Sequence, residues 1–180
     1  MAYTAGIDIE FATKNSLRKI IEIFVLAGWE YQFQNRICYV PHCSNILNWE
    51  QAPAAAWPEV FAILESKHAR HEAADIVLYW KDTHCGCAFH VYPDGDVSLD
   101  FGSERVMLEN CNSFTDVSWY LARTVCPLQK EGLRVETVRF SEIRTPTLGL
   151  AFEHPLSTRM FFGDDLPNPI HLDPEELAIR

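Results

Sequence analysis

Three consecutive apolar-rich segments between residues 75 and 101 constrain the fold more than any other part of the sequence. The segments span residues 75–80, 87–92 and 97–101. Short apolar runs of this length, bounded by turn residues, are typical of strands, and the last segment also alternates apolar and polar residues as a strand with one buried face does. The dipeptide Asp94-Gly95 separates the last two segments, and an Asp-Gly pair in this position is a strong signal for a tight hairpin. The sequence therefore predicts three adjacent antiparallel strands.

The N-terminal part of the chain predicts a strand followed by a helix. Residues 3–12 alternate as a strand does, with isoleucines on one face and acids on the other. Apolar residues then recur at helical spacing from near Ser16, with Thr13 or Asn15 as the expected N-cap. Gly28 marks the end of this helix, because glycine readily adopts the left-handed conformation found there.

The remaining elements complete a single domain. The predicted elements are a hairpin at 29–40, a surface loop at 42–56, a helix at 57–70, a helix from Thr115 or Asp116 that Pro127 stops, and a strand at 133–140. We therefore expect one α+β domain over residues 1–180, in which a largely antiparallel sheet is covered by about three helices. Residues 145–180 are expected to form a C-terminal extension, with short strands at 148–152 and 160–162, a loop at 163–169 and a terminal helix from Asp173.

Composition excludes several classes of protein. The chain has 180 residues, 48% of them hydrophobic, which is enough for one sizeable core. The longest apolar run, 20–28, contains Glu22 and is too short to cross a bilayer, so we expect no membrane partner. The N-terminus lacks the pattern of a signal peptide, and we therefore expect a cytoplasmic protein. Its six cysteines should then remain thiols, most of them buried.

The formal charge of −10 argues against a nucleic-acid partner, because proteins that bind nucleic acids need a basic surface. The acids are unevenly distributed. Residues 91–120 contain six acids and one base, Arg105. A basic partner would be steered toward this region.

The densest group of chemically capable side chains is His84, Cys85, Cys87 and His90. Zinc requires four nitrogen or sulfur ligands, and a structural site usually takes them from C-x-x-C knuckles, whereas one residue separates Cys85 from Cys87. On an extended chain the two cysteines face one side and the two histidines the other. We interpret the group as strand residues and expect neither a metal nor another cofactor. Further possible ligands elsewhere are Cys38, His42 and Cys43.

Other catalytic patterns are weak. The eight glycines form neither of the phosphate-binding motifs G-x-G-x-x-G and G-x-x-x-x-G-K, which disfavours nucleotide enzymes. The carboxylate pairs are Asp94 with Asp96 and Asp164 with Asp165, and both are typical of turns and loops. We therefore expect a protein without catalytic activity.

The acidic region from Asp94 to Asp116 has two interpretations that stay open. Its aromatic neighbours include Tyr92, Phe101 and Trp119. They could form a recognition surface for a basic partner, with one aromatic anchor. They could equally be a solvated sheet face with aromatic side chains in the core.

Residues 1–145 resemble the immunity proteins of bacterial toxin systems, including contact-dependent growth inhibition. The similarity lies in Gly28-Trp29 after the first helix, Trp57-Pro58-Glu59-Val60 at the start of the second, the Asp94-Gly95 hairpin and residues 114–121. The resemblance implies stoichiometric binding of a cognate toxin domain, often a basic nuclease, whose active site is plugged or whose access to substrate is blocked. On this reading the expected contact residues are Tyr92, Asp94, Asp96, Asp100, Glu104, Glu109 and Trp119.

Two other functions also stay open. A secretion chaperone or adaptor is likewise small, acidic and cytoplasmic, but it would expose an apolar groove and usually dimerises. A small metal- or thiol-dependent hydrolase would use His84, Cys85, Cys87 and His90.

Overall fold

A computed structural model describes residues 2–42, 48–81, 83, 85–102, 104–109, 111–145 and 156–161. The helices are α1 (Leu17–Ala27), α2 (Trp57–Ala69) and α3 (Val117–Lys130), with a short 3-10 turn η1 (Ala54–Ala56) before α2. The strands are β1 (Ala2–Phe11), β2 (Trp29–Glu30), β3 (Arg36–Tyr39), β4 (Glu50–Pro53), β5 (Ala74–Trp80), β6 (Gly86–Val91), β7 (Val97–Phe101), β8 (Met107–Leu108), β9 (Cys111–Thr115), β10 (Val135–Thr145) and β11 (Leu156–Phe161).

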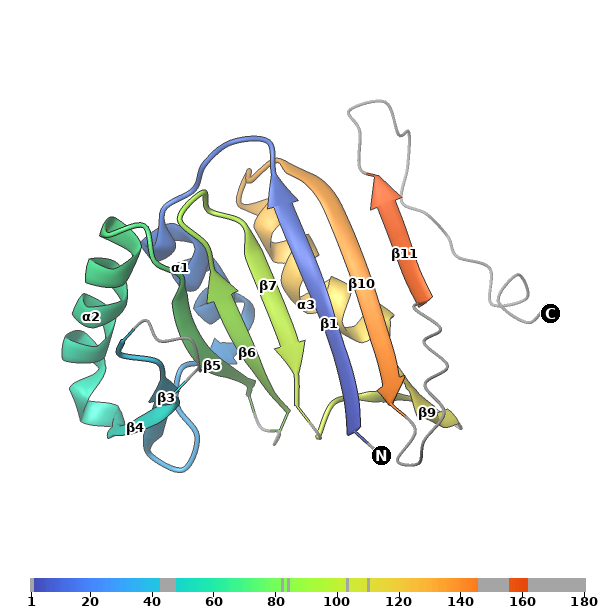
Figure 1. The fold of residues 1–180 in the computed structure, drawn as a ribbon, viewed down its shortest axis with the longest axis horizontal. Coiled ribbons are helices and arrows are strands. Elements are labelled where there is room, and N and C mark those ends of the chain that lie inside the picture. The colour runs from blue at the N-terminus through green and yellow to red at the C-terminus, as the bar shows by residue number, and fades with distance from the viewer. Residues whose placement is uncertain are drawn as a thin grey trace.

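Within the described residues, nine strands form one sheet (Figure 1). Eight of them lie in the order β11-β10-β1-β7-β6-β5-β3-β4, and β2 also pairs with β5. Every one of these pairings is antiparallel. β8 and β9 form a separate two-stranded sheet. The predicted α+β domain with a largely antiparallel sheet and three helices is confirmed.

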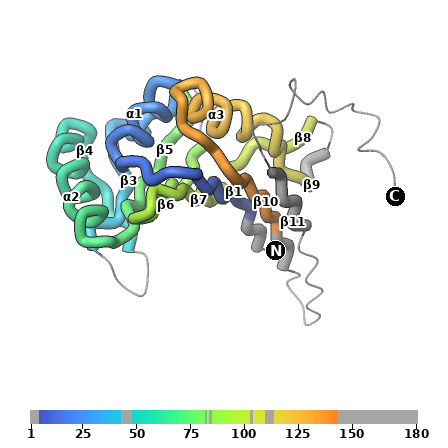
Figure 2. The backbone as a smooth tube through the Cα atoms, turned by 90° about the horizontal axis from the view of Figure 1, so that it is seen from above, coloured from blue at the N-terminus to red at the C-terminus, as the bar shows by residue number. Residues whose placement is uncertain are grey.

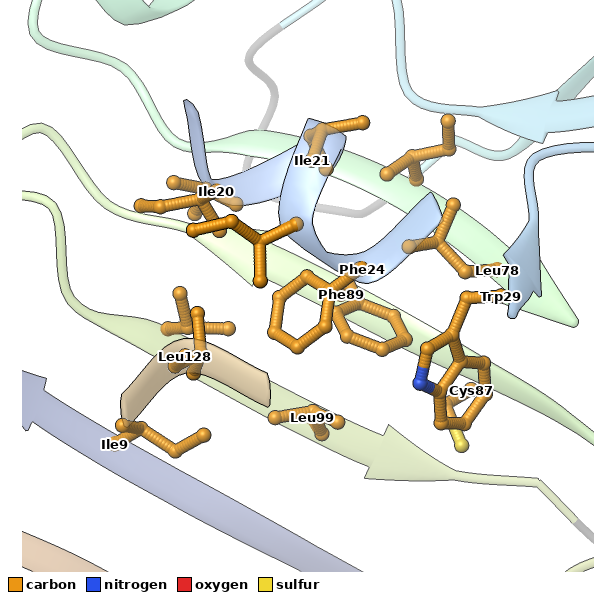
Figure 3. Close-up of a cluster of buried hydrophobic side chains, with 14 of the residues drawn as sticks. Ile9, Ile20, Ile21, Phe24, Trp29, Leu78, Cys87, Phe89, Leu99 and Leu128 are labelled. Atoms are coloured by element: carbon orange, nitrogen blue, oxygen red, sulfur yellow. The ribbon is translucent and has the colours of Figure 1, made fainter. Parts of the chain in front are cut away.

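Helices α1 and α3 lie on one face of the sheet, and α2 lies near β3, β4 and β5 (Figures 1 and 2). The core fills the space between this face and the helices. Alternate residues of the central strands, such as Ile9, Phe89 and Leu99, meet Phe24 of α1 and Leu128 of α3 there (Figure 3). No helix in the described part of the chain covers the middle of the opposite side, which we call the open face, and α2 reaches only its edge, where Lys67 contacts Asp75.

The hairpin between β6 and β7 and the ends of α1 follow from their local sequence. Gly95 has a φ of 96°, and a Cβ there would lie 2.6 Å from the backbone nitrogen of Asn15. Gly28, with a φ of 114°, ends α1 as predicted. The N-cap differs from the prediction, because Ser16 itself accepts a hydrogen bond from the Lys19 N–H. Ser16 is in the extended conformation that an N-cap requires, one residue before the first helical turn.

Helix α3 continues through Pro127 to Lys130, so the prediction that this proline ends the helix is wrong. Proline has no N–H, and the carbonyl four residues earlier, on Arg123, therefore loses its helical donor. The indole Nε1–H of Trp29 donates to that oxygen at 2.9 Å. Trp29 is completely buried. A side chain from β2 thus satisfies the helix at the point where proline would otherwise disrupt it.

The predicted hairpin at 29–40 is correct only at its turn. Gln34 and Asn35 have positive φ angles, and Phe33 and Arg36 exchange two backbone hydrogen bonds of 2.9 Å around them. β2 instead pairs with the far end of β5, and β3 pairs with β4, inside the segment predicted to be a loop. The sequence of β4, Glu-Gln-Ala-Pro, has no apolar alternation because this strand lies at an exposed edge.

The C-terminal part agrees with the prediction in part. β10 extends to Thr145, beyond the predicted strand at 133–140, and β11 overlaps the strand predicted at 160–162. The strand at 148–152, the loop at 163–169 and the helix from Asp173 lie outside the described residues. None of the described helices has the length and apolar character needed to cross a membrane.

Candidate functional site on the open face of the sheet

A row of polar side chains crosses five strands on the open face. Asp75 of β5 lies opposite His90 of β6, which lies opposite Ser98 of β7. Ser98 in turn lies opposite Asp8 of β1, and Asp8 lies opposite Arg139 of β10. Residues directly opposite each other in a ladder point to the same face of the sheet. The fold therefore joins side chains from distant parts of the sequence into one surface.

Four charged groups at one end of this row form a buried ion network. The Lys67 ammonium, from α2, donates to Asp75 Oδ2 at 2.9 Å and to the Val40 carbonyl at 2.8 Å. His90 Nδ1 lies 2.8 Å from Asp75 Oδ1, and His90 Nε2 lies 3.4 Å from Asp100 Oδ2. Lys67, Asp75 and His90 are buried, whereas the side chain of Asp100 is 58% exposed. The network thus runs from the interior to one carboxylate on the open face.

The pKa values in this network favour the charged forms. Burial favours the neutral form of His90, but hydrogen bonds and charges from Asp100 and Asp75 outweigh it and raise its pKa to about 9. Burial likewise favours a protonated Asp75, yet hydrogen bonds from His90 and Lys67 and their charges lower its pKa. Both histidine nitrogens therefore carry protons at neutral pH and donate to the two carboxylates. The alternating charges orient the Asp100 carboxylate toward His90.

Further acids line the open face beside this network. Asp8 is exposed and accepts a hydrogen bond of 2.7 Å from the Ser98 hydroxyl. Glu10, two residues along β1, pairs with Arg139. Asp8 and Asp100 are thus two exposed carboxylates on the neighbouring strands β1 and β7. Gly6 lies directly opposite Asp100, and Asp8 is two residues further along β1.

A second group of acids gathers where the β6–β7 hairpin meets the end of β1. Asp96 accepts the backbone N–H of Phe11 at 3.0 Å. Burial raises the pKa of Asp96, and the charges of Asp94, Glu10 and Glu136 raise it further against the effect of that hydrogen bond. We call these four acids the hairpin end, and they extend the negative charge of the open face.

The open face is hollowed next to the ion network. The hollow has a volume of about 380 Å³. Gly86 and Ala88 of β6, two of the smallest residues on this face, line the hollow, and the Tyr79 ring of β5 lies against Gly86. The remaining walls include Cys38, Trp49, Val77, His90, Asp100 and Gly102.

Two aromatic side chains are partly exposed around these acids. Trp49, 36% exposed, contacts the His90 ring at its edge, with the ring centroids 6.2 Å apart. Tyr92 is 41% exposed. Burial raises the pKa of Tyr92, and so do the charges of Asp8, Asp100 and Asp75. Tyr92 therefore lies within the electrostatic reach of the open-face acids.

The structure places four of the seven predicted contact residues in the two acidic groups described above. Tyr92 and Asp100 lie beside the open-face acids, and Asp94 and Asp96 lie at the hairpin end. Trp119 is not among them, because it lies on α3, which covers the core face of the sheet. Its ring packs against Trp80, and the Arg123 guanidinium lies 4.2 Å from its ring centroid.

Glu104 and Glu109 are exposed in the connection that carries β8. The structure places them in neither of the acidic groups described above. Arg105, the one base of this region, is buried, and its guanidinium lies 3.6 Å from Glu142. The acidic stretch of sequence is therefore divided among several parts of the surface.

The Cys and His group has the alternation expected of a strand. Cys85 and Cys87 are buried in the core, whereas His90 points to the open face. The hydrogen bond to Cys87 lowers the pKa of Cys85 to about 7 against the effect of burial, and Cys85 Sγ lies 3.3 Å from the Tyr120 hydroxyl. At 4% exposure this thiol faces the core and not a substrate.

Two of the possible metal ligands, His84 and Cys43, lie outside the described residues. Within the described part of the chain, no three His, Cys, Asp or Glu side chains are grouped as ligands of a metal ion would be.

Four residues of this site were not predicted from the sequence, namely Lys67, Asp75, Asp8 and Trp49. A signal existed for Lys67, because it follows Val60 and Leu64 at helical spacing on the buried stripe of α2. A lysine there needs a buried partner, and Asp75 is the acid at the start of the next strand. Asp8 and Trp49 had no local signal, since their roles depend on strand pairing and on the path of a loop.

No family model, curated protein or solved structure matches this chain.

Proposed function

We propose that the protein binds a basic protein partner in a stoichiometric complex through its open face. The resemblance to immunity proteins gives the partner class, a cognate toxin domain such as a basic nuclease, which the bound protein would neutralise by occlusion. This role requires a preformed surface and no turnover. We expect the complex to form in the cytoplasm.

One observation carries this proposal: exposed carboxylates and aromatic side chains converge on a sheet face whose middle no described helix covers. Asp8 and Asp100 supply negative charge, and Tyr92 and Trp49 supply partly exposed aromatic area. Complementary charge accelerates the encounter with a basic partner, and aromatic side chains contribute much of the affinity once they are desolvated.

The rigidity of this surface supports the same function. Asp100 is held by His90, which is held by Asp75, which is held in turn by Lys67. A carboxylate fixed before binding loses little conformational entropy in the complex. The ion network therefore prepares the surface for tight binding without taking part in any reaction.

A second candidate function, the chaperone or adaptor, is favoured by a groove between α1 and α2. Ile21, Val25, Leu26, Trp57 and Phe61 contribute apolar walls, and Leu26 is 80% exposed. An exposed apolar groove is the feature expected of a protein that binds an apolar segment. A stable dimer in light scattering, disrupted by Leu26→Asp, would favour this function over the proposed one.

The proposed function is tested by affinity capture from cells of the source organism. The bait is the wild-type chain, the double variant Asp8→Asn/Asp100→Asn, or the matched control Glu59→Gln/Glu131→Gln. Both doubles remove two exposed charges, but the control changes acids on α2 and just after α3.

We expect one basic protein to bind the wild type and the control with 1:1 stoichiometry and to be lost from the open-face variant. Expression of that protein alone should arrest growth, and co-expression with the wild-type chain should restore it. A partner retained equally by both doubles would contradict the proposal, as would a captured protein whose expression is harmless.

A further inference from the structure

We propose that the hollow beside Trp49 and Asp100 receives one cationic side chain of the partner, preferably an arginine. This inference rests on the proposed function and names the chemical group that the open face recognises. The hollow is the point where a carboxylate, an aromatic ring and a floor of small residues meet.

The shape of the hollow suits one long side chain. Its volume of about 380 Å³ equals that of roughly a dozen water molecules. Ala88 presents a small side chain over which a chain of methylene groups can lie along the strand surface, and the Tyr79 ring lies against the neighbouring Gly86. Val77, on the neighbouring strand, adds an apolar contact for the same methylenes. A side chain that enters would displace water from an apolar floor.

Asp100 supplies the charged acceptor. Its Oδ2 faces His90 Nε2, while its side chain remains 58% exposed. The carboxylate therefore has lone pairs directed to solvent, where a guanidinium N–H can donate a charge-assisted hydrogen bond. Asp8 on the neighbouring strand adds a second negative charge nearby.

Trp49 supplies the aromatic wall. Its ring is 36% exposed and already makes an edge contact with the protonated His90. A tryptophan face attracts cations, and the planar guanidinium of arginine stacks on it better than a compact ammonium does. This geometry favours arginine over lysine.

The charges that face the hollow leave room for an added cation. His90 is protonated, but Asp75 offsets its charge on one side and Asp100 on the other, and Lys67 is offset by Asp75. The two cations and two carboxylates of the network cancel. Asp8, on the neighbouring strand β1, then adds a negative charge beside this neutral network.

The direct test uses N-acetyl-arginine methylamide as the probe, followed by NMR on the ¹⁵N-labelled full chain. N-acetyl-citrulline methylamide is the neutral control, because it has nearly the same shape without the charge. We expect the arginine probe to shift the amides of Gly86, Ala88 and Gly102 and the indole signal of Trp49. Binding of the citrulline probe should be weaker by on the order of tenfold.

Two variants locate the binding. Ala88→Leu fills the hollow and should abolish the probe-induced shifts. Ser141→Leu adds the same apolar group to the exposed open face of β10, outside the hollow, and should leave them unchanged. Equal binding of the two probes, or shifts that survive Ala88→Leu, would overturn the inference.

The same variants separate this inference from the proposed function. Ala88→Leu should weaken binding of the captured partner at least about tenfold, mainly through faster dissociation. If that partner depends on Asp8 and Asp100 but not on Ala88, the hollow is not the anchor site and the proposed function stands. If no basic partner exists but the arginine probe binds in the hollow, the proposed function fails and the site remains.

Discussion

Replacing Trp29 by phenylalanine tests how α3 tolerates a proline inside it. The indole N–H donates to the Arg123 carbonyl that Pro127 leaves without a helical donor, and Trp29 is completely buried. Trp29→Phe leaves this carbonyl without its donor, which costs about 1–3 kcal/mol. The smaller ring also leaves a void beside Trp80, Phe89 and Trp119, and we expect a total loss of roughly 2–4 kcal/mol.

A double-mutant cycle isolates the hydrogen-bond part of this loss. Pro127→Ala restores an N–H that can donate to the Arg123 carbonyl, so in that background Trp29→Phe removes packing alone. We therefore expect a coupling free energy of about 1–2 kcal/mol between the two substitutions. Urea denaturation of the four proteins, followed by fluorescence and far-UV circular dichroism, measures each free energy of unfolding.

The control cycle combines Pro127→Ala with Trp57→Phe. Trp57 lies on α2 and stacks on Tyr31, away from Pro127, so these two substitutions should be additive. A coupling between Trp29 and Pro127 that is also zero within about 0.5 kcal/mol would refute the reasoning, because the indole would then stabilise the protein by packing only.

Three further predictions concern the ion network and the β6–β7 hairpin. The pKa of His90 is raised from 6.5 to about 9, so protonated His90 contributes on the order of 3 kcal/mol to the free energy of unfolding. This contribution is complete below pH 6.5 and is lost as the pH rises through 9, and urea denaturation should show the decline in the wild type but not in His90→Gln. Lys67→Met removes one of the two cations that pair with the buried Asp75 and leaves the Val40 carbonyl without its donor, so it should lower the free energy of unfolding by about 2–3 kcal/mol. Lys19→Met, at an exposed position, should change it by less than about 0.5 kcal/mol, and equal effects of the two substitutions would contradict the burial of the Lys67–Asp75 pair. Gly95→Ala places a side chain at a positive φ and against the loop between β1 and α1, which should lower the free energy of unfolding by about 1–3 kcal/mol. Calorimetry should show this loss as a Tm lower by several degrees, and an unchanged Tm would mean that the loop moves aside freely.

The central strands could be predicted because their signals are local. The short apolar segments between residues 75 and 101 and the Asp94-Gly95 turn both depend on neighbours in the sequence, and the structure places β5, β6 and β7 side by side there. The two-residue period of a strand likewise separates the buried Cys85 and Cys87 from His90. Local patterns determine which face a side chain takes once the strand forms.

The errors occurred where tertiary contacts override local preference. A proline ends most helices, but in α3 the indole N–H of Trp29, from β2, replaces the backbone donor that Pro127 lacks. β4 has no strand pattern of its own and is recruited by the free edge of β3. Both outcomes depend on residues far away in the chain, so no local pattern could have revealed them.

The candidate site was predictable only in part for the same reason. Counting acids along the chain grouped Glu104 and Glu109 with Asp100, but the structure brings Asp100 close to Asp8 through the register of β1 and β7. Trp119 was included because it is aromatic and close in sequence, yet its helix covers the other face. Neighbours in sequence are not neighbours on a sheet unless the strand pairing makes them so.

The most direct test of the proposed function is the rate of association with the captured partner as ionic strength varies. At about 0.01 M salt, where charges act over roughly 30 Å, Asp8→Asn/Asp100→Asn should associate on the order of tenfold more slowly than Glu59→Gln/Glu131→Gln, and the difference should vanish near 1 M salt. Equal rates for the two double variants at low salt would show that the partner does not approach the open face.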